Sequence, residues 1–254
     1  MPDSTVSVTV CGSAGTHVGP GRACSSYLLS AGGHRVVLDL GNGSLANVQR
    51  VCDVADLDAV VVSHQHPDHF ADVYSLYYAL RFHPDGPHSV GGYAPAGTSA
   101  FALQLLATDA TEQFGRIVAL ETVGAGDVVR EGPMRLEFFR ARHPIETLAV
   151  RVEVGGVVIA YSADTAPAPE IVDCARGADL FICDATWLER QRPLPEGVHM
   201  TGVEAGKAAA EAGVHRLLLS HILPCLDPDE TFAEAAGAFD GELLLAEDLQ
   251  ELRL

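Results

Sequence analysis

Three histidines and one aspartate lie within the six positions 64–69 of this chain, in the sequence HQHPDH. A tight turn can direct His64 and His66, two residues apart, toward one metal ion, while Asp68 and His69 point toward a second. Imidazole and carboxylate groups suit divalent ions such as Zn²⁺, Mn²⁺ or Fe²⁺. Two such ions can hold an attacking hydroxide and a substrate oxygen together. The segment therefore predicts a metal-dependent hydrolase.

Three more residues of metal-ligand type follow predicted strands. His143 comes after a strand at residues 135–140, and Asp164 and His221 come after strands at residues 157–161 and 217–220. Strand ends are places where a rigid scaffold presents side chains on short loops. Taken alone, a histidine beside a strand is more often a surface or hydrogen-bonded residue, and an aspartate such as Asp164 suits a turn or a helix N-cap. Together with the cluster they give five histidines and two aspartates, enough for two ions that share one carboxylate.

The chain around these residues predicts an α/β fold of strands and helices in two groups. The first group has strands at residues 5–10, 25–30, 35–40 and 59–62, and helices at 70–82 and 98–114. Residues 84–95 form a Gly/Pro-rich connection. The second group has strands at residues 135–140, 149–154, 157–161, 180–183 and 216–220, and helices at 202–212 and 228–239. This pattern indicates two mixed sheets packed together with helices outside, in one domain over residues 1–254.

The composition favours a soluble, cytoplasmic protein. The chain has 254 residues, of which 48% are hydrophobic, enough to bury one substantial core. It has no apolar run of the ~18–20 residues that a membrane span needs, and residues 1–4 do not begin a signal peptide. The six cysteines form no Cys-x-x-Cys pair, and free thiols are expected.

The charge of the chain favours a small substrate. Its formal net charge is −18, from 34 acidic and 16 basic residues, and no run of Lys or Arg offsets it. A surface this acidic repels polyanions. We therefore expect a small-molecule substrate, with no long nucleic acid and no membrane as partner.

The His-x-His-x-Asp-His signature and the three remaining residues of the set resemble the metallo-β-lactamase superfamily of dinuclear metal hydrolases. The resemblance covers nearly the whole chain and implies an αββα sandwich. It also implies two divalent ions, of which Zn²⁺ is favoured over Mn²⁺ or Fe²⁺. The first ion would be bound by His64, His66 and His143, the second by Asp68, His69 and His221, and Asp164 would bridge both.

Two further residues match positions of that family. Asp39 matches an acidic residue that supports the metal loop from behind, although a plain turn residue at the end of a strand would look the same. Trp187, the only tryptophan, matches an aromatic position and is interpreted as a core residue rather than a base-stacking platform.

Three stretches, at residues 11–28, 177–187 and 199–221, are similar to the tRNase Z-like phosphodiesterases of this superfamily. In that branch the histidine of a His-x-Thr motif lies near the scissile phosphate and acts as a general acid or phosphate contact. Here that residue is His199, which joins Asp68 as a predicted catalytic residue. Because a helix follows at once, backbone N–H groups at residues 201–203 are also expected to face an anion.

Two departures argue against tRNA maturation. Only twenty residues separate His143 from Asp164, which leaves no room for the Gly/Pro-rich arm of the tRNA-processing members. The chain also has Ile222 and Leu223 where that family places an Arg shortly after the last histidine ligand. Residues 74–84 are instead similar to a bacterial group that includes cyclic-nucleotide phosphodiesterases. The favoured function is hydrolysis of a small phosphodiester, such as a cyclic nucleotide, by a metal-bridging hydroxide.

Several alternatives stay open at this point. The same hydroxide attacks a carbonyl carbon, so a hydrolase of a lactone, ester or thioester fits the same ligands. A non-catalytic metal-bound scaffold or regulatory protein is a further alternative. A zinc β-lactamase is disfavoured because Asp164 stands where those enzymes usually use Cys, and a diiron reductase is disfavoured because it usually has Glu in place of His66. The family often dimerises, and the sequence leaves a homodimer open.

Overall fold

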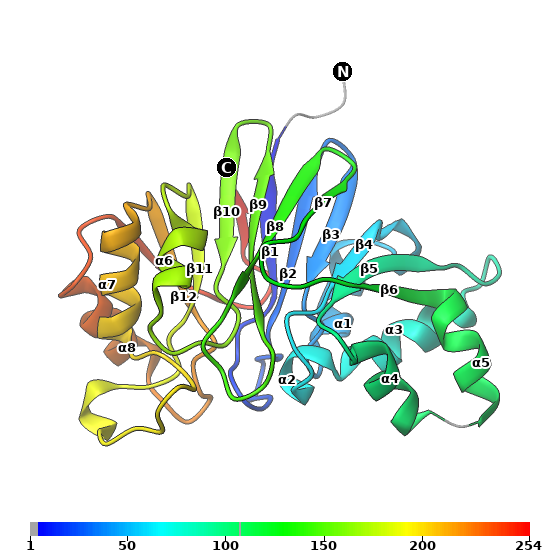
Figure 1. Cartoon of the computed structure of the whole chain (residues 1–254), viewed down its shortest axis with the longest axis horizontal. Helices are drawn as coiled ribbons and strands as arrows, with labels where there is room; N and C mark the ends of the chain where they lie inside the picture. Colours follow the sequence, from blue (N-terminus) through cyan, green and yellow to red (C-terminus); the bar gives the residue numbers. More distant parts are fainter. Residues whose placement is uncertain (1–4, 107) are drawn as a thin grey trace.

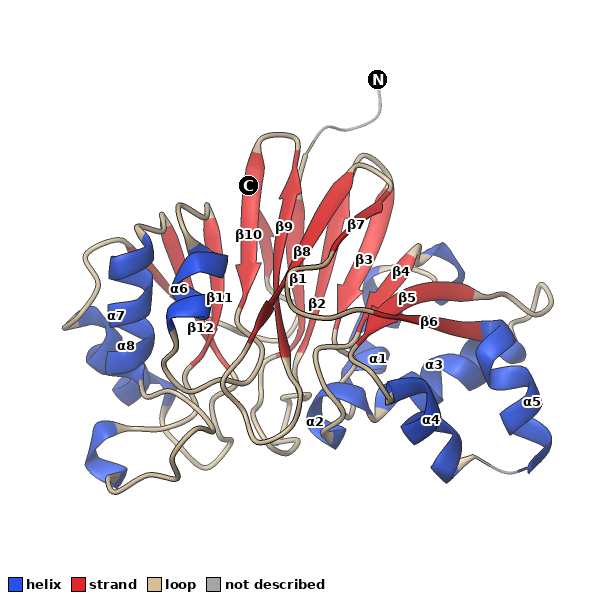
Figure 2. Ribbon diagram, viewed as in Figure 1, coloured by secondary structure: helices blue, strands red, loops and turns tan. Residues whose placement is uncertain are grey.

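The computed structural model describes residues 5–106 and 108–254. Two seven-stranded sheets pack face to face, and helices cover their outer faces (Figure 1, Figure 2). This arrangement confirms the predicted αββα sandwich. The assignment of residues 1–254 to a single domain stays a prediction. Within the described part of the chain, no helix combines the length and the apolar character needed to cross a membrane.

The first sheet has the strand order β14-β1-β2-β3-β4-β5-β6. Its strands are β1 (Ser7–Gly12), β2 (Ser26–Ala31), β3 (His34–Leu38), β4 (Ala59–Val61), β5 (Val90–Ala94), β6 (Val118–Thr122) and β14 (Glu251–Arg253). Strands β14, β1, β2 and β3 pair antiparallel, whereas β3 to β6 pair parallel. The helices α1 (Ser44–Val51), α2 (Pro67–Phe70), α3 (Asp72–Arg81), α4 (Thr98–Ala102) and α5 (Thr108–Ile117) lie on this side of the molecule.

The second sheet has the order β13-β12-β11-β10-β9-β8-β7. Its strands are β7 (Val128–Glu131), β8 (Met134–Arg140), β9 (Leu148–Val154), β10 (Val157–Tyr161), β11 (Leu180–Asp184), β12 (Arg216–Ser220) and β13 (Glu242–Leu245). Because β8, β10, β11 and β12 all run in the same direction, their carboxyl ends lie at one edge of the sheet. The helices α6 (Pro169–Ala175), α7 (Gly202–Ala212) and α8 (Pro228–Ala236) lie on this side (Figure 2).

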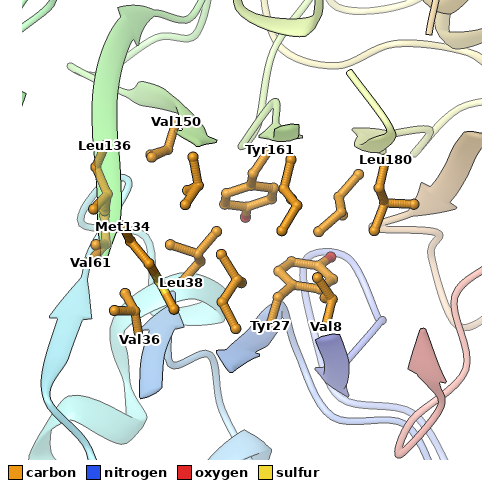
Figure 3. Packing of buried hydrophobic residues seen from close by; sticks show 14 of the residues in the cluster. Val8, Tyr27, Val36, Leu38, Val61, Met134, Leu136, Val150, Tyr161 and Leu180 are labelled. Carbon is orange, nitrogen blue, oxygen red and sulfur yellow. The ribbon is translucent and has the colours of Figure 1, made fainter. Parts of the chain in front are cut away.

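The core between the sheets is apolar and ends at two tyrosines. Alternate residues of a strand face the same side of a sheet, so Leu38 and Val36 of β3 meet Leu136 of β8 across the core (Figure 3). Tyr27 and Tyr161, one from each sheet, pack with their ring centroids 5.0 Å apart. Both hydroxyls are hydrogen-bonded, that of Tyr27 to the Ser220 hydroxyl at 2.6 Å. The core therefore leads into a buried polar layer.

Two local predictions were wrong. The connection predicted at residues 84–95 contains strand β5, which glycines conceal because they are poor strand formers. A Cβ at Gly92 would lie 2.0 Å from the Val60 carbonyl oxygen, so the close pairing of β5 with β4 requires glycine there. The single helix predicted at residues 98–114 is interrupted, with a 3₁₀ turn at Leu103–Leu105 between α4 and α5.

Gly41 is a second position where close packing requires glycine, and it lies behind the metal loop. A Cβ there would lie 2.0 Å from the Asp68 carbonyl oxygen and 2.7 Å from the Cys24 Cβ. We expect Gly41→Ala to lower the free energy of unfolding by about 1–3 kcal/mol, the usual cost of overpacking. Gly91→Ala is the matched control, because a Cβ at Gly91 meets no atom within 4 Å. Chemical denaturation measures both variants, and equal stability of the two would contradict the prediction.

Candidate metal centre

The predicted ligands come from loops and one short helix at one end of the two sheets. His64 and His66 follow β4, and Pro67 is the first residue of α2, a position that suits its fixed φ. Asp68 and His69 consequently lie in the first turn of α2, which lies below the strands in Figure 1. His143, Asp164 and His221 follow β8, β10 and β12. The parallel course of these three strands brings residues far apart in sequence to one place.

One group of ligand atoms gathers around His66. Its Nδ1 lies 3.1 Å from the Nε2 atoms of both His64 and His143. The Oδ2 atom of Asp164 lies 3.6 Å from the His64 Nε2. These four side chains each offer one donor atom, and the four atoms lie within 4.8 Å of one another.

A second group gathers around His221. Its Nε2 lies 3.2 Å from the His69 Nε2 and 3.1 Å from the Asp68 Oδ2. The Oδ1 atom of Asp164 lies 2.9 Å from the His69 Nε2. Asp164 therefore offers one oxygen to each group, and the structure brings all seven predicted ligands together.

The donor atoms of both groups fit divalent cations. Imidazole nitrogens that face each other at 3.1–3.2 Å repel unless a proton or a cation lies between them. Asp164 Oδ1 is buried and has no hydrogen-bond partner within the described residues, although a buried carboxylate normally needs one. A cation that accepts these lone pairs satisfies both conditions, and imidazole with carboxylate is a donor set for Zn²⁺, Mn²⁺ or Fe²⁺.

The electrostatics of the first group agree with this fit. Burial holds the pKa of His64 well below its ordinary value and also lowers the pKa of His66 and His143. These rings are neutral near pH 7, which is the form that binds metal. Burial would raise the pKa of Asp164, but the neighbouring His221 and His69 outweigh it and hold that pKa well below its ordinary value. Asp164 is therefore ionised near pH 7, the form in which a carboxylate binds a metal ion.

Asp39 supports the metal loop from behind, as the family resemblance implied. Its Oδ2 accepts hydrogen bonds from the His69 Nδ1–H, the Ser63 hydroxyl and the Tyr161 hydroxyl, each at 2.7 Å. Its Oδ1 accepts the Ser63 amide at 2.6 Å. Because the Nδ1 of His69 is bonded to Asp39, its Nε2 is the nitrogen that faces the other ligands. Asp39 is fully buried, so these bonds hold it firmly.

Backbone strain also concentrates at this place. Thr16, Asp39, Ala163 and His221 have positive φ angles of 64°, 58°, 50° and 58°, a conformation that side chains other than glycine rarely adopt. The Thr16 amide donates to the Asp68 Oδ2 at 2.8 Å, and the other three residues are ligands, neighbours of ligands or ligand supports. Strain of this kind clusters at functional sites, where the surrounding structure imposes it.

His199 lies beside both ligand groups. Its ring centroid is 5.5 Å from that of His143 and 5.1 Å from that of His221, and its Nδ1 lies 4.0 Å from the Asp164 Oδ2. The Nδ1–H donates to the Asp184 Oδ2 at 2.8 Å. Burial opposes protonation of the ring, but the charges of Asp184 and Asp164 outweigh it and raise the pKa of His199 to about 9. The structure therefore places His199 at the site as predicted.

Asp184 was not assigned a role from the sequence, yet it organises this side of the site. It ends β11, and it accepts hydrogen bonds from the Thr165 amide at 3.0 Å and from the Thr186 hydroxyl at 2.6 Å. The Thr186 hydroxyl also lies 2.7 Å from the His221 Nδ1. The available signal was its position at the end of an apolar strand, which Asp164 and His221 share.

Two predictions around His199 need correction. The first two of the backbone N–H groups expected to face an anion are already bonded within the protein: the Thr201 amide donates to the Glu204 Oε2 at 3.0 Å and the Gly202 amide to the Trp187 carbonyl at 3.3 Å. The first of these bonds belongs to a capping box, in which the Glu204 amide in turn donates to the Thr201 hydroxyl at 3.2 Å. Trp187 is only half-buried, and its ring packs edge-on against His199 with centroids 5.9 Å apart. It therefore contacts the site rather than the core alone.

Comparison with known proteins identifies the family. A family model described as "Beta-lactamase superfamily domain" matches residues 34–222. The chain is a metallo-hydrolase of the beta-lactamase superfamily. A Bacillus subtilis protein named "Probable metallo-hydrolase YhfI" is 31% identical over 245 residues, which cover 94% of this chain and 96% of YhfI. The YhfI crystal structure covers 98% of this chain and matches with a TM-score of 0.88 at 26% identity.

Other relatives of this metallo-hydrolase carry more specific names. Ribonuclease Z of Haloarcula marismortui is 28% identical over 305 residues, covering 98% of this chain and 97% of that protein. The crystal structure of a diphosphatase from the PhnP family matches with a TM-score of 0.78 at 18% identity, over 98% of each chain, and shows the shared fold.

The hydrolase lacks an arm between His143 and Asp164, as predicted. After a short loop, the antiparallel strands β9 and β10 with a turn at Gly155 and Gly156 fill most of that interval. The strands run directly back to the site. This chain is therefore similar in sequence to ribonuclease Z but has no arm between His143 and Asp164.

The Tyr161 hydroxyl gives a test of how the hydrolase supports its metal loop. It touches no predicted metal ligand more closely than 3.3 Å but holds the Asp39 carboxylate that orients His69. We expect Tyr161→Phe to weaken metal affinity about tenfold, within the range typical of lost outer hydrogen bonds. Tyr27→Phe removes an equally buried hydroxyl that bonds Ser220 instead, and should leave affinity unchanged. Competition with a chromogenic chelator measures both, and equal affinities would refute the prediction.

Proposed function

We propose that this metallo-hydrolase is a dinuclear phosphodiesterase that cleaves a small phosphodiester such as a cyclic nucleotide. The observation that carries the proposal is the position of His199, a histidine held by Asp184 and directed at the centre formed by both ligand groups. A proton donor in this position suits an alkoxide leaving group. The names of its relatives, a ribonuclease and a diphosphatase, also support phosphate chemistry.

In this proposal the seven ligands divide between two ions, of which Zn²⁺ is favoured over Mn²⁺ or Fe²⁺. His64, His66 and His143 would bind the first ion, Asp68, His69 and His221 the second, and Asp164 would serve both. When bound, the ions would lower the pKa of water and offset the negative charge of the phosphate oxygens.

The side chains of the protein supply proton transfer and orientation. Because the His199 Nδ1–H is committed to Asp184, its Nε2 would hold the proton that the departing oxygen receives. Asp68, the other proposed catalytic residue, is fixed by the Thr16 amide through Oδ2 and can orient the attacking water with its carboxylate. Asp184 is a positioning residue, since it acts through His199.

The charge of the chain supports a small substrate. A net charge of −18 disfavours long nucleic acid, and the interval between His143 and Asp164 has no arm that would bind one. Location in the cytoplasm and formation of a homodimer stay predictions from the sequence.

The test is metal analysis of untagged protein followed by a substrate panel. The panel contains bis-p-nitrophenyl phosphate, cyclic AMP, an acyl-homoserine lactone and an acyl thioester. We expect about two divalent ions per chain and a kcat/KM that is highest for one of the phosphodiesters. Preference for the lactone or thioester would replace the proposal with a carbonyl hydrolase of the same fold. Fully metal-loaded protein that is inert toward the whole panel would favour a non-catalytic role.

A further inference from the structure

Two arginines at the end of β8 lie beside the metal centre. Arg142 immediately precedes the ligand His143, and Arg140 lies two residues earlier, with the buried Ala141 between them. Alternation along an extended chain places Arg140 and Arg142 on the same side, and both are exposed. The Arg142 backbone is fixed, because its N–H donates to the Thr165 hydroxyl at 3.1 Å and its carbonyl accepts the Ala166 amide at 2.9 Å. Arg142 is therefore held close to the site by the fold.

The two arginines line neighbouring clefts that lead away from His199. A cleft of about 330 Å³ is lined by His199 and Arg142, among other residues. The next cleft, of about 270 Å³, is lined by Arg142 and Arg140. The two clefts share Arg142 and Pro167, so together they form a path from His199 past Arg142 to Arg140. A substrate group attached to the departing oxygen would extend along this path.

The charges of these arginines are not neutralised. Arg192, which also lines the first cleft, is committed to Glu189 and Glu204, each at 2.7 Å. Arg140 and Arg142, in contrast, form no ion pair or side-chain hydrogen bond within the part of the chain that the structure describes. The carboxylates of Glu170 and Glu196 are exposed at the cleft rims and pair with neither arginine. In a chain with 34 acidic and 16 basic residues, two adjacent unpaired guanidinium groups favour an anionic ligand.

We propose that Arg140 and Arg142 form a subsite for a second phosphate group, carried by the part of the substrate that is attached to the departing oxygen. The proposal rests on the proposed function, since it assigns the scissile phosphodiester to the metal centre and the second phosphate to the arginines. Planar guanidinium groups bind phosphate through paired hydrogen bonds, and Arg suits this role better than Lys. The substrate class is a phosphodiester whose departing alcohol carries a further phosphate.

Binding to the metal-loaded protein tests this subsite without requiring turnover. Titration calorimetry would compare adenosine 5′-monophosphate, which has one phosphate, with adenosine 3′,5′-bisphosphate, which has two. We expect the wild-type protein to bind the bisphosphate about tenfold more tightly, the effect of one added charge-assisted contact. In the double variant Arg140→Gln/Arg142→Gln the ratio should fall to about one. The ratio is taken within each variant, so changes at the metal centre cancel.

Control variants separate the subsite from general charge effects. Arg130→Gln removes an exposed arginine of β7 that is also unpaired within the described residues, and it should keep the tenfold ratio. In Arg142→Gln alone, the ratio of the two affinities should fall to a value between those of the wild-type protein and the double variant. This single variant replaces the double variant in the test if circular dichroism shows that the double variant does not fold. The preference should also weaken as salt is raised, because the arginines are exposed.

Three results would overturn the subsite. They are equal affinity of the wild-type protein for the two ligands, a ratio that survives in the double variant, and failure of both ligands to bind. The proposed function fails by a different result, the absence of phosphodiester turnover in the substrate panel. A tenfold ratio without turnover would therefore keep the subsite and reject the phosphodiesterase, and turnover without the ratio would do the reverse.

Discussion

Replacement of Asp164 by alanine is expected to remove both metal ions from the hydrolase and to reduce phosphodiester turnover to background. Asp164 is the one side chain that offers an oxygen to each ligand group, with Oδ1 at 2.9 Å from the His69 Nε2 and Oδ2 at 3.6 Å from the His64 Nε2. Its loss also removes the carboxylate that lies between the two groups of imidazoles. We expect metal affinity to fall by more than about 100-fold, beyond the effect of losing an outer hydrogen bond.

The metal content of purified variants, measured by inductively coupled plasma mass spectrometry, checks this expectation. His64→Ala is the comparison variant, because His64 belongs to one group only, and it should lose one ion and most activity. Asp164→Asn keeps the shape of the side chain but removes its charge, and it should behave like the alanine variant. Retention of two ions in Asp164→Ala would show that the carboxylate does not serve both groups.

The seven side chains that the structure brings together could be selected from the sequence because they are of metal-ligand type. Four ligands lie within six positions, and His143, Asp164 and His221 each follow an apolar strand. The residues that hold the ligands and His199 in place were harder to predict. An aspartate such as Asp39 or Asp184 at a strand end also suits an ordinary turn, and only the folded chain brings His69 and His199 within 2.7 and 2.8 Å of them.

The fold class followed from periodicity, but individual strands did not. The β5 strand contains Gly91 and Gly92, which lower strand propensity. Glycine is required at position 92 because the Val60 backbone approaches it closely, and this contact is visible only in the folded chain. The edge strand β7 has no fully buried residue, so it shows no apolar alternation to detect. Likewise, the sequence does not show whether the backbone N–H groups at the start of α7 are free to bind an anion. In the structure, Thr201 and Glu204 bond to each other in a capping box.

Substitution of His199 by alanine should leave the metal content unchanged and lower kcat for a phosphodiester by about 10²- to 10⁴-fold, the usual contribution of a general acid. His199 is not one of the seven predicted ligands, and its Nδ1–H is bonded to Asp184 rather than directed at the ligand nitrogens. Loss of the ring therefore removes a proton donor and spares both ligand groups. Steady-state kinetic assays measure kcat, and metal analysis of the same samples measures the metal content.

The dependence on the leaving group distinguishes proton donation from a structural role. A p-nitrophenolate leaves without a proton, whereas the alkoxide released from cyclic AMP needs one, so His199→Ala should slow cyclic AMP hydrolysis far more than hydrolysis of bis-p-nitrophenyl phosphate. Asp184→Asn should show the same pattern more weakly, because Asp184 acts only through the imidazole that it orients. Trp187→Phe keeps an aromatic ring against His199 and should retain the wild-type pattern. An equal loss for both substrates in His199→Ala would mean that the ring shapes the site without transferring a proton, and no loss for either would exclude His199 from catalysis.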